Sequence, residues 1–250
     1  MIQTPVQAET ATQSSNLSNP AATASNTGFD VKKFNMREAR FNMIEQQIRT
    51  WEVLDPVVLA LLDEVPRESF VAESQAGLAF ADVELPIGHG QTMLFPKLEG
   101  RILQALSVRK TDKVLLVGTG SGYLTALLAK LAMHVHAVEI IPELSAQAQQ
   151  NLNKAGIDNV TLHVGDGVCG LPNQAPFDVI VYTGSMQIRP AVVEKTLAVG
   201  GRMFAVIGDL PIMEATLTQR VSEDAFRHEV LFETCLLPLM NAPRLTRFEF

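Results

Sequence analysis

A glycine-rich turn constrains this chain more than any other feature of its sequence. Residues 114–117 read VLLV, a continuous apolar run that is typical of a strand buried on both faces of a parallel sheet. Residues 124–131 favour a helix. A strand, a glycine-rich turn and a helix in this order begin the nucleotide-binding unit of open α/β sheets. The turn between them consists of Gly118, Thr119, Gly120, Ser121 and Gly122.

The chain beyond the turn continues to alternate between strands and helices. Strands are predicted at 135–140, 159–164, 177–182 and 202–207, and helices at 142–155 and 191–197. This alternation predicts an α/β fold with a Rossmann-like, doubly wound and mostly parallel sheet. Residues 216–221 and 228–237, joined by a short polar turn, predict an antiparallel hairpin at the edge of that sheet.

Three helices are predicted before the turn. Apolar residues recur at helical spacing within 34–51, a second helix opens with Asp55 as N-cap and Pro56 as its first residue, and a third covers 97–106. The first two helices either pack against the sheet or form a lid over a bound cofactor. Glycines and prolines bracket polar residues in 85–96, which predicts an ordered loop there.

These patterns divide the chain into three parts. Residues 1–28 contain no aromatic residue and no apolar period, so they predict a disordered tail. Residues 29–108 hold the N-terminal helices and the ordered loop. Residues 109–250 form the Rossmann-like core with its C-terminal β-hairpin.

The composition excludes several classes of function. The formal net charge is −7 and no run of Lys and Arg stands out, so we expect no binding to nucleic acid. The apolar runs are too short to span a membrane. Two cysteines far apart and the lack of a secretory signal predict a cytoplasmic protein without disulfides. The cysteines and histidines show no ligand spacing, so no metal site is expected, and we expect a monomer.

Acidic residues follow two of the predicted strands at the edge where such sheets bind ligands. Glu139 lies roughly 20 residues after the first glycine of the turn, where an acid reaches a ribose diol. Asp166 ends the next strand and can accept a hydrogen bond from the adenine amine. These acids and the G-x-G-x-G spacing favour S-adenosylmethionine as the cofactor. A nicotinamide dinucleotide remains the alternative.

The chain resembles the protein-L-isoaspartate O-methyltransferase family from about residue 40 to 238. The matching segments are MIEQQIRTWEVLDP (43–56), VPRESFV (65–71), LPIGHGQTM (85–93), VLLVGTGSGY (114–123), VEIIPEL (138–144), VGDG (164–167), PFDVIV (176–181) and VGGRM (199–203). The resemblance implies a class I methyltransferase fold in which the last strand is antiparallel. It also implies that Gly118, Gly120, Glu139, Asp166 and Gly167 hold S-adenosylmethionine, and we include Thr119, Ser121 and Gly122 in the predicted cofactor site.

The family repairs damaged proteins by methylating the side carboxylate of an L-isoaspartyl residue. The resemblance therefore implies a protein or peptide substrate that carries such residues. A carboxylate is ionised at pH 7, so the reaction needs no general base and depends on positioning and exclusion of water. The loop at 88–96 matches the family's substrate loop, which makes Gln91 and Thr92 candidate catalytic residues.

Two residues depart from the family pattern. Leu94 stands where the family has a serine whose hydroxyl lies near the substrate carboxylate, and leucine forms no hydrogen bond through its side chain. Thr92, Thr183, Ser185 or backbone amides are candidates to replace that hydroxyl. Leu116 stands where the family usually has an acid. Three interpretations stay open: an isoaspartyl methyltransferase, a methyltransferase for another nucleophile, and a protein that binds the cofactor without catalysis.

Overall fold

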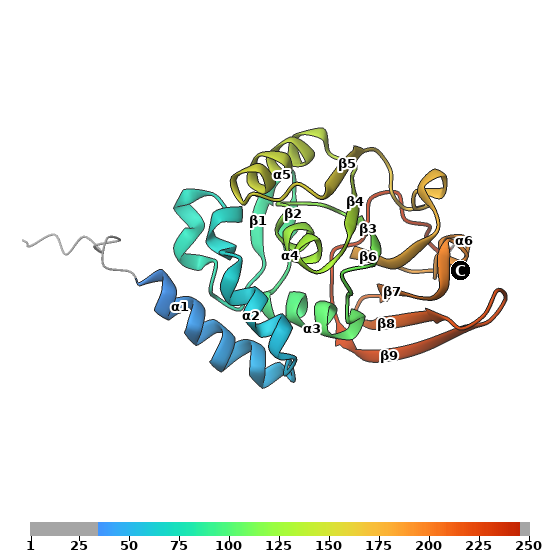
Figure 1. Ribbon diagram of the computed structural model, residues 1–250, viewed down its shortest axis with the longest axis horizontal. Coiled ribbons are helices and arrows are strands. Elements are labelled where there is room, and N and C mark those ends of the chain that lie inside the picture. The colour runs from blue at the N-terminus through green and yellow to red at the C-terminus, as the bar shows by residue number, and fades with distance from the viewer. Residues whose placement is uncertain (1–34, 246–250) are drawn as a thin grey trace, which may run out of the picture. The chain divides into compact units, whose positions relative to one another are not determined.

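A seven-stranded sheet forms the centre of the described part of the chain, residues 35–245 of the computed structural model (Figure 1). Its strands lie in the order β5-β4-β3-β6-β7-β8-β9. The predicted tail at 1–28 lies outside the described residues. The five parallel strands are β3 (Lys113–Val117), β4 (His134–Glu139), β5 (Val160–Val164), β6 (Phe177–Met186) and β7 (Leu197–Asp209).

The register of the parallel strands brings their carboxyl ends together. Val117, the last residue of β3, lies opposite Val138 of β4 and Tyr182 of β6. The glycine turn, which follows Val117, therefore lies at the same edge as the ends of both neighbouring strands. This is the arrangement that the alternation of strands and helices predicted.

The predicted hairpin is formed by β8 (Ile212–Arg220) and β9 (Phe226–Thr234) at one edge of the sheet. Both pairings, β7 with β8 and β8 with β9, are antiparallel. The strand that runs against the parallel strands is therefore β8, the last but one, and β9 runs with them again.

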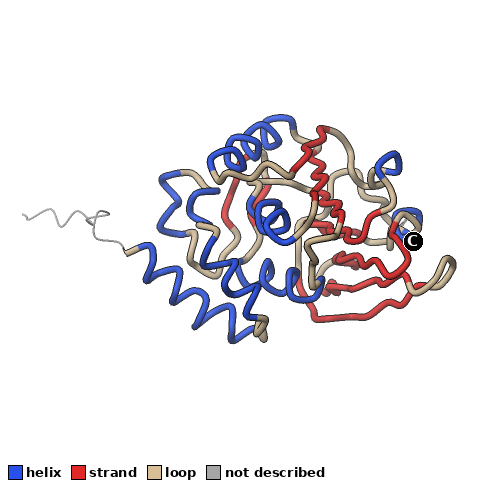
Figure 2. Tube along the Cα trace, in the orientation of Figure 1, coloured by secondary structure: helices blue, strands red, loops and turns tan. Residues whose placement is uncertain are grey.

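Six α-helices occur among residues 35–245 (Figure 2). The first continues through a π-helical turn (Ile44–Ile48) and a 3₁₀ turn (Arg49–Trp51). The carboxylate of Asp55 accepts hydrogen bonds from two amides of the next helix, as its predicted role as N-cap requires. The helices are α1 (Met36–Met43), α2 (Pro56–Glu64), α3 (Pro96–Leu106), α4 (Tyr123–Leu131), α5 (Pro142–Lys154) and α6 (Ala191–Glu194).

Two hydrophobic clusters lie on the two faces of the sheet. The larger cluster contains side chains of α2, α3 and α4 together with Leu116 of β3. The smaller contains Val193 of α6 together with Leu115 of β3. Neighbouring residues of one strand point to opposite faces, so a strand buried in both clusters must be apolar throughout. This explains the continuous VLLV run.

The structure differs from the predictions in several places, among them the starts of β7 and β8, which lie at 197 and 212 rather than at 202 and 216. Residues 85–96 are not only a loop, because β1 (Leu85–Gly88) and β2 (Gln91–Met93) pair as a short antiparallel hairpin. Gly88, His89 and Gly90 have positive φ angles, which reverse the chain within a tight turn. Strand β6 runs on to Met186 past the predicted end at 182, and α6 ends at Glu194 rather than at 197. In residues 35–245 no helix has the length and apolar character needed to cross a membrane.

Candidate functional site

A cavity opens at the carboxyl ends of β3, β4 and β6, where open α/β sheets bind their ligands. The space between the atoms of its wall amounts to about 940 Å³, with the open solvent at its mouth included. The glycine turn, the segments after β4 and β5, and the hairpin β1–β2 form its wall. Of the predicted site residues the wall includes Gln91, Thr92, Leu94, Gly118, Thr119, Gly120, Ser121, Glu139, Asp166 and Gly167, but not Gly122.

The glycine turn is held tightly against the end of β6. Gly118 has a φ of +91°, and a Cβ at this position would lie 2.0 Å from the Thr183 hydroxyl oxygen. That hydroxyl shares its one proton between the carbonyls of Val117 and Gly118, at 3.0 and 2.9 Å. Only glycine fits this conformation and this approach. Thr183, one of the candidates to replace the serine hydroxyl, therefore fixes the glycine turn.

Glu139 connects the end of β4 to the glycine turn. One carboxylate oxygen accepts from the amide of Gly120 at 2.8 Å, and the other accepts from the amide of Ile141 at 3.1 Å. The residue is buried yet lines the cavity. A carboxylate has about four acceptor sites, so each oxygen retains a lone pair for a ligand hydroxyl. This placement fits the predicted contact with a ribose diol.

Asp166 follows β5, lines the cavity and is exposed. Its carboxylate accepts from the amide of Val168 at 2.9 Å and from the side-chain amide of Asn241 at 3.0 Å. The second bond joins the end of β5 to the C-terminal segment, which also lines the cavity. At Gly167 a Cβ would lie 2.8 Å from a methyl group of Val117, so the chain passes close to β3.

Thr119 provides a direct test of whether the cavity suits the predicted cofactor. Its hydroxyl oxygen is buried and has no hydrogen-bond partner among the described residues. Buried polar groups are almost always paired, so an orphaned hydroxyl in a cavity wall indicates a polar ligand. S-adenosylmethionine carries a carboxylate and an ammonium group that meet this requirement. Together with the glycine turn and Glu139, Thr119 fits the cofactor.

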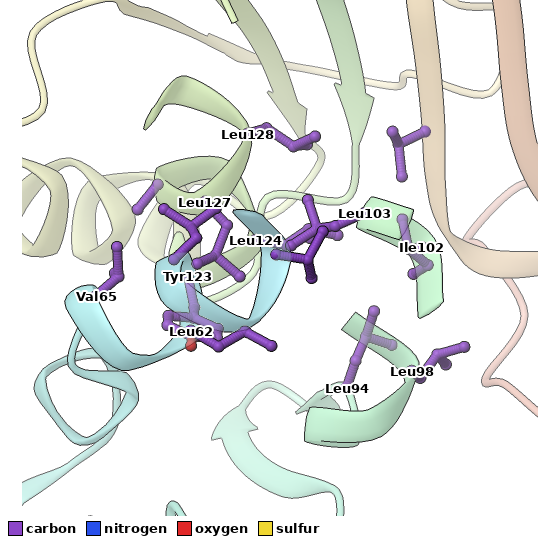
Figure 3. Close-up of a cluster of buried hydrophobic side chains, with 14 of the residues drawn as sticks. Leu62, Val65, Leu94, Leu98, Ile102, Leu103, Tyr123, Leu124, Leu127 and Leu128 are labelled. Carbon is purple, nitrogen blue, oxygen red and sulfur yellow. The ribbon is translucent and has the colours of Figure 1, made fainter. Parts of the chain in front are cut away.

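Leu94 is part of the hydrophobic core and also lines the cavity beside the hairpin β1–β2. Its side chain is 8% exposed and belongs to the same buried cluster as Leu98 and Leu124 (Figure 3). It lines the cavity with Gln91 and Thr92 of β2. Nothing in this position offers the hydroxyl that the family serine provides. Leu116, the other departure, is fully buried in the larger cluster.

A buried ion pair under the hairpin was not predicted. Arg67 and Glu99 are each 1% exposed and in direct contact, and the Arg67 guanidinium also donates to the carbonyl of Leu94. The guanidinium lies over the ring of Tyr123, the first residue of α4, at 5.2 Å. Burial raises the pKa of Glu99 to about 8, although the attraction of Arg67 opposes this rise. The pair links the hairpin to the helix that follows the glycine turn.

Glu84 is a second residue of the wall that sequence reasoning missed. It precedes β1, lines the cavity and forms a hydrogen bond with the Thr92 side chain. Burial raises its pKa, and the hydrogen bond from Thr92 opposes this rise. No positional pattern pointed to it, because its contact with the cavity depends on how the hairpin folds back over the sheet.

Ser185, His89 and the first two helices lie outside the wall of this cavity. Ser185 is buried and donates to the carbonyl of Leu236. His89 is exposed at the tip of the β1–β2 turn and absent from the wall. Helices α1 and α2 contribute no residue to the wall, which favours packing over the lid interpretation. Within residues 35–245 no group of three His, Cys, Asp or Glu side chains is arranged to hold a metal ion.

Comparison with known proteins gives consistent matches over most of the chain. The sequence profile of the protein-L-isoaspartate(D-aspartate) O-methyltransferase family matches residues 38–243. Protein-L-isoaspartate O-methyltransferase 2 of Pelobacter propionicus is 37% identical over 209 residues, which are 83% of this chain and 93% of that protein. The protein-L-isoaspartate O-methyltransferase of Protochlamydia amoebophila is 41% identical over 203 residues, or 80% of this chain and 95% of that protein.

Solved structures show the same fold. One protein-L-isoaspartate O-methyltransferase superposes with a TM-score of 0.69 at 25% identity, over 81% of this chain and 65% of that chain. A Plasmodium falciparum structure, described as a protein-L-isoaspartate O-methyltransferase in complex with S-adenosyl-L-homocysteine, superposes with a TM-score of 0.68 at 20% identity. That match covers 82% of this chain and 98% of the other. The predicted class I methyltransferase fold is confirmed.

Proposed function

Because this chain belongs to the protein-L-isoaspartate(D-aspartate) O-methyltransferase family, we propose that it methylates the side carboxylate of L-isoaspartyl residues in damaged proteins. It is an S-adenosylmethionine-dependent O-methyltransferase. The nicotinamide alternative has no support from these relatives. The proposal leaves open how the acceptor is held, since Leu94 replaces the family serine.

We assign a role to each polar group that lines the cavity beside the glycine turn. Glu139 would accept hydrogen bonds from the ribose hydroxyls, and Asp166 would accept one from the adenine amine. The Thr119 hydroxyl would donate to the methionine carboxylate or accept from its ammonium group. When bound, S-adenosylmethionine supplies an electrophilic methyl group. These residues would hold the cofactor in a cavity whose wall also includes the hairpin β1–β2.

The acceptor end has to bring a carboxylate oxygen into line with the methyl group. An ionised carboxylate needs no base, so the site acts through positioning and exclusion of water. Leu94 and Met93 supply apolar surface that excludes water, and Gln91 and Thr92 supply the polar groups of β2. The Arg67 bond to the Leu94 carbonyl holds this strand end in place.

The observation that carries the proposal is one cavity that joins the predicted cofactor residues to the hairpin matching the family's substrate loop. The test is transfer of labelled methyl from S-adenosylmethionine to an isoaspartyl peptide, with the aspartyl peptide of identical sequence as control. We expect a base-labile methyl ester on the isoaspartyl peptide alone. Equal labelling of both peptides, or none while the cofactor binds, would contradict the proposal.

A second candidate is transfer to another nucleophile, favoured by the replacement of the serine by Leu94. It predicts labelling of components in a cell extract while the isoaspartyl peptide stays unlabelled. We keep as further proposals a cytoplasmic location, on the basis of the two isolated cysteines, and a monomeric state. The division of the chain at residue 108 also stays a prediction.

A further inference from the structure

Glu84 lies where the cofactor cavity meets a second cavity. The second cavity runs between β6, β7 and the C-terminal segment and shares Glu84 and residues 236–239 with the first. A peptide whose isoaspartyl side chain enters the first cavity has room for its backbone in the second. On the proposed function, which this inference requires, Glu84 therefore stands beside the acceptor carboxylate.

The described wall of the cofactor cavity contains acids but no Lys, Arg or His side chain. Glu139 and Asp166 are occupied with backbone amides at the cofactor end, and Glu99 contacts Arg67. For Glu84, residues 35–245 provide no ion pair, only the hydrogen bond with Thr92. The wall of the second cavity also contains the charged residues Asp209 and Arg244. An incoming carboxylate thus finds no cation in the wall of the first cavity.

Two carboxylates that share a site of low polarity do not both stay ionised, because their repulsion raises the pKa of one of them and a proton is retained. We propose that Glu84 binds the acceptor carboxylate as a neutral carboxylic acid and thereby supplies the hydrogen-bond donor that Leu94 lacks. The partial burial that already raises the pKa of Glu84 in the free protein acts in the same direction.

The Thr92 hydroxyl does not fill this role in the free protein. A hydroxyl has one proton to donate, and Thr92 donates it to the Glu84 carboxylate. Once Glu84 carries a proton of its own, it can donate to the acceptor, and Thr92 keeps the Glu84 side chain oriented. The two residues act as one unit, in which Thr92 is the positioning residue.

The transfer balances without a further reactant. One acceptor oxygen accepts the hydrogen bond from Glu84, and the other forms the new C–O bond to the methyl carbon. The S–C bond of the sulfonium breaks, and its electron pair goes to sulfur. The proton stays on Glu84 during the transfer. The product ester is neutral and no longer raises the pKa of Glu84, so the proton is released afterwards.

The test compares wild type with Glu84→Gln, whose carboxamide donates a hydrogen bond at every pH. We expect kcat/KM of the wild type for the isoaspartyl peptide to fall about tenfold per pH unit above the pKa of Glu84 in the free protein. Glu84→Gln is expected to lack this fall and to exceed the wild type at alkaline pH. Glu99 titrates in both proteins, so its contribution cancels in the comparison.

A binding measurement provides a second readout. Calorimetry of the isoaspartyl peptide with the S-adenosylhomocysteine-loaded protein, repeated in buffers of different ionisation enthalpy, counts the protons taken up. We expect uptake of about one proton by the wild type at pH 7 and none by Glu84→Gln. Glu73→Gln, which removes an exposed acid outside both cavities, serves as the matched control and should behave like the wild type.

Each outcome decides a different question. Methylation with the same pH profile and the same proton uptake in wild type and Glu84→Gln would overturn the inference and leave the proposed function intact. Failure of all three proteins to methylate the peptide at any pH, with the cofactor bound, would contradict the proposed function and the inference with it. A flat profile and lost proton uptake in Glu84→Gln alone would support the inference.

Discussion

Replacing Leu94 by serine is expected to improve acceptor binding and to weaken the fold. Leu94 is 8% exposed and packs with Leu98 and Leu124 (Figure 3), but one side of it faces the cavity. Truncation of a buried leucine lowers the unfolding free energy by about 2–5 kcal/mol. Because Leu94 also faces the cavity, we expect Leu94→Ser to cost about 2 kcal/mol, near the lower end of this range. The serine hydroxyl in return offers a donor to the acceptor carboxylate.

The kinetic effect should appear in KM rather than in kcat. A hydrogen bond to a charged group contributes about 1.5–3 kcal/mol, which corresponds to a change of about tenfold or more in affinity. The carboxylate loses charge as its oxygen bonds to the methyl carbon, so the donor stabilises the bound substrate at least as well as the transition state. We therefore expect a KM about tenfold lower and a kcat that does not rise.

Leu94→Ala is the matched control, because it loses the same packing without gaining a hydroxyl. Both variants are assayed for methyl transfer to the isoaspartyl peptide at a temperature at which thermal unfolding shows them folded. Equal KM values for Leu94→Ser and Leu94→Ala would refute the reasoning. A higher kcat at unchanged KM would refute it as well, since it would mean that the hydroxyl acts only in the transition state.

Three further changes test the scaffold of the site. Thr183→Val removes two hydrogen bonds to the glycine turn and should lower the unfolding free energy by about 1–2 kcal/mol in a urea titration; an unchanged midpoint would contradict its role. Arg67→Met leaves Glu99 buried without its partner and should cost about 3–5 kcal/mol, whereas the double variant with Glu99→Leu should recover most of this loss; equal losses would exclude coupling. Burial lowers the pKa of His136 from 6.5 to about 4. Between these pH values the unfolded chain therefore binds a proton that the folded protein does not bind. The free energy of unfolding should fall by about 1–2 kcal/mol as the pH drops from 6.5 to 4, after allowance for solvent screening. His136→Phe should remove that part of the pH dependence, and an unaltered profile would disprove the assignment.

The parts of the site that were predictable depend on short stretches of sequence. The turn from Gly118 to Gly122 follows a buried strand directly, and Glu139 and Asp166 end the next two strands. In a parallel sheet all these ends meet at one edge, so local patterns and topology together place them in one cavity. The remaining prediction, that each of them contacts the cofactor, awaits a binding experiment.

The parts that were not predictable depend on packing between distant segments. Arg67 and Glu99 are 32 residues apart and meet only because the segment around Arg67 packs against α3. Glu84 reaches the cavity through the same hairpin, whose strand pairing is too short to leave a periodic signal. Thr183 lies just past the predicted strand at 177–182, and its contact with Gly118 depends on the continuation of β6 past residue 182.

The most direct test of this account is a calorimetric titration of S-adenosylmethionine into the folded protein, with Glu139→Ala and the control Glu143→Ala beside it. Glu143 is exposed in the first turn of α5 and takes no part in the cavity wall. We predict one molecule bound per chain, an affinity at least about tenfold weaker in Glu139→Ala, and no change in Glu143→Ala. Absence of binding heat in wild-type protein whose fold is verified by circular dichroism, or equal affinity in Glu139→Ala, would contradict the account.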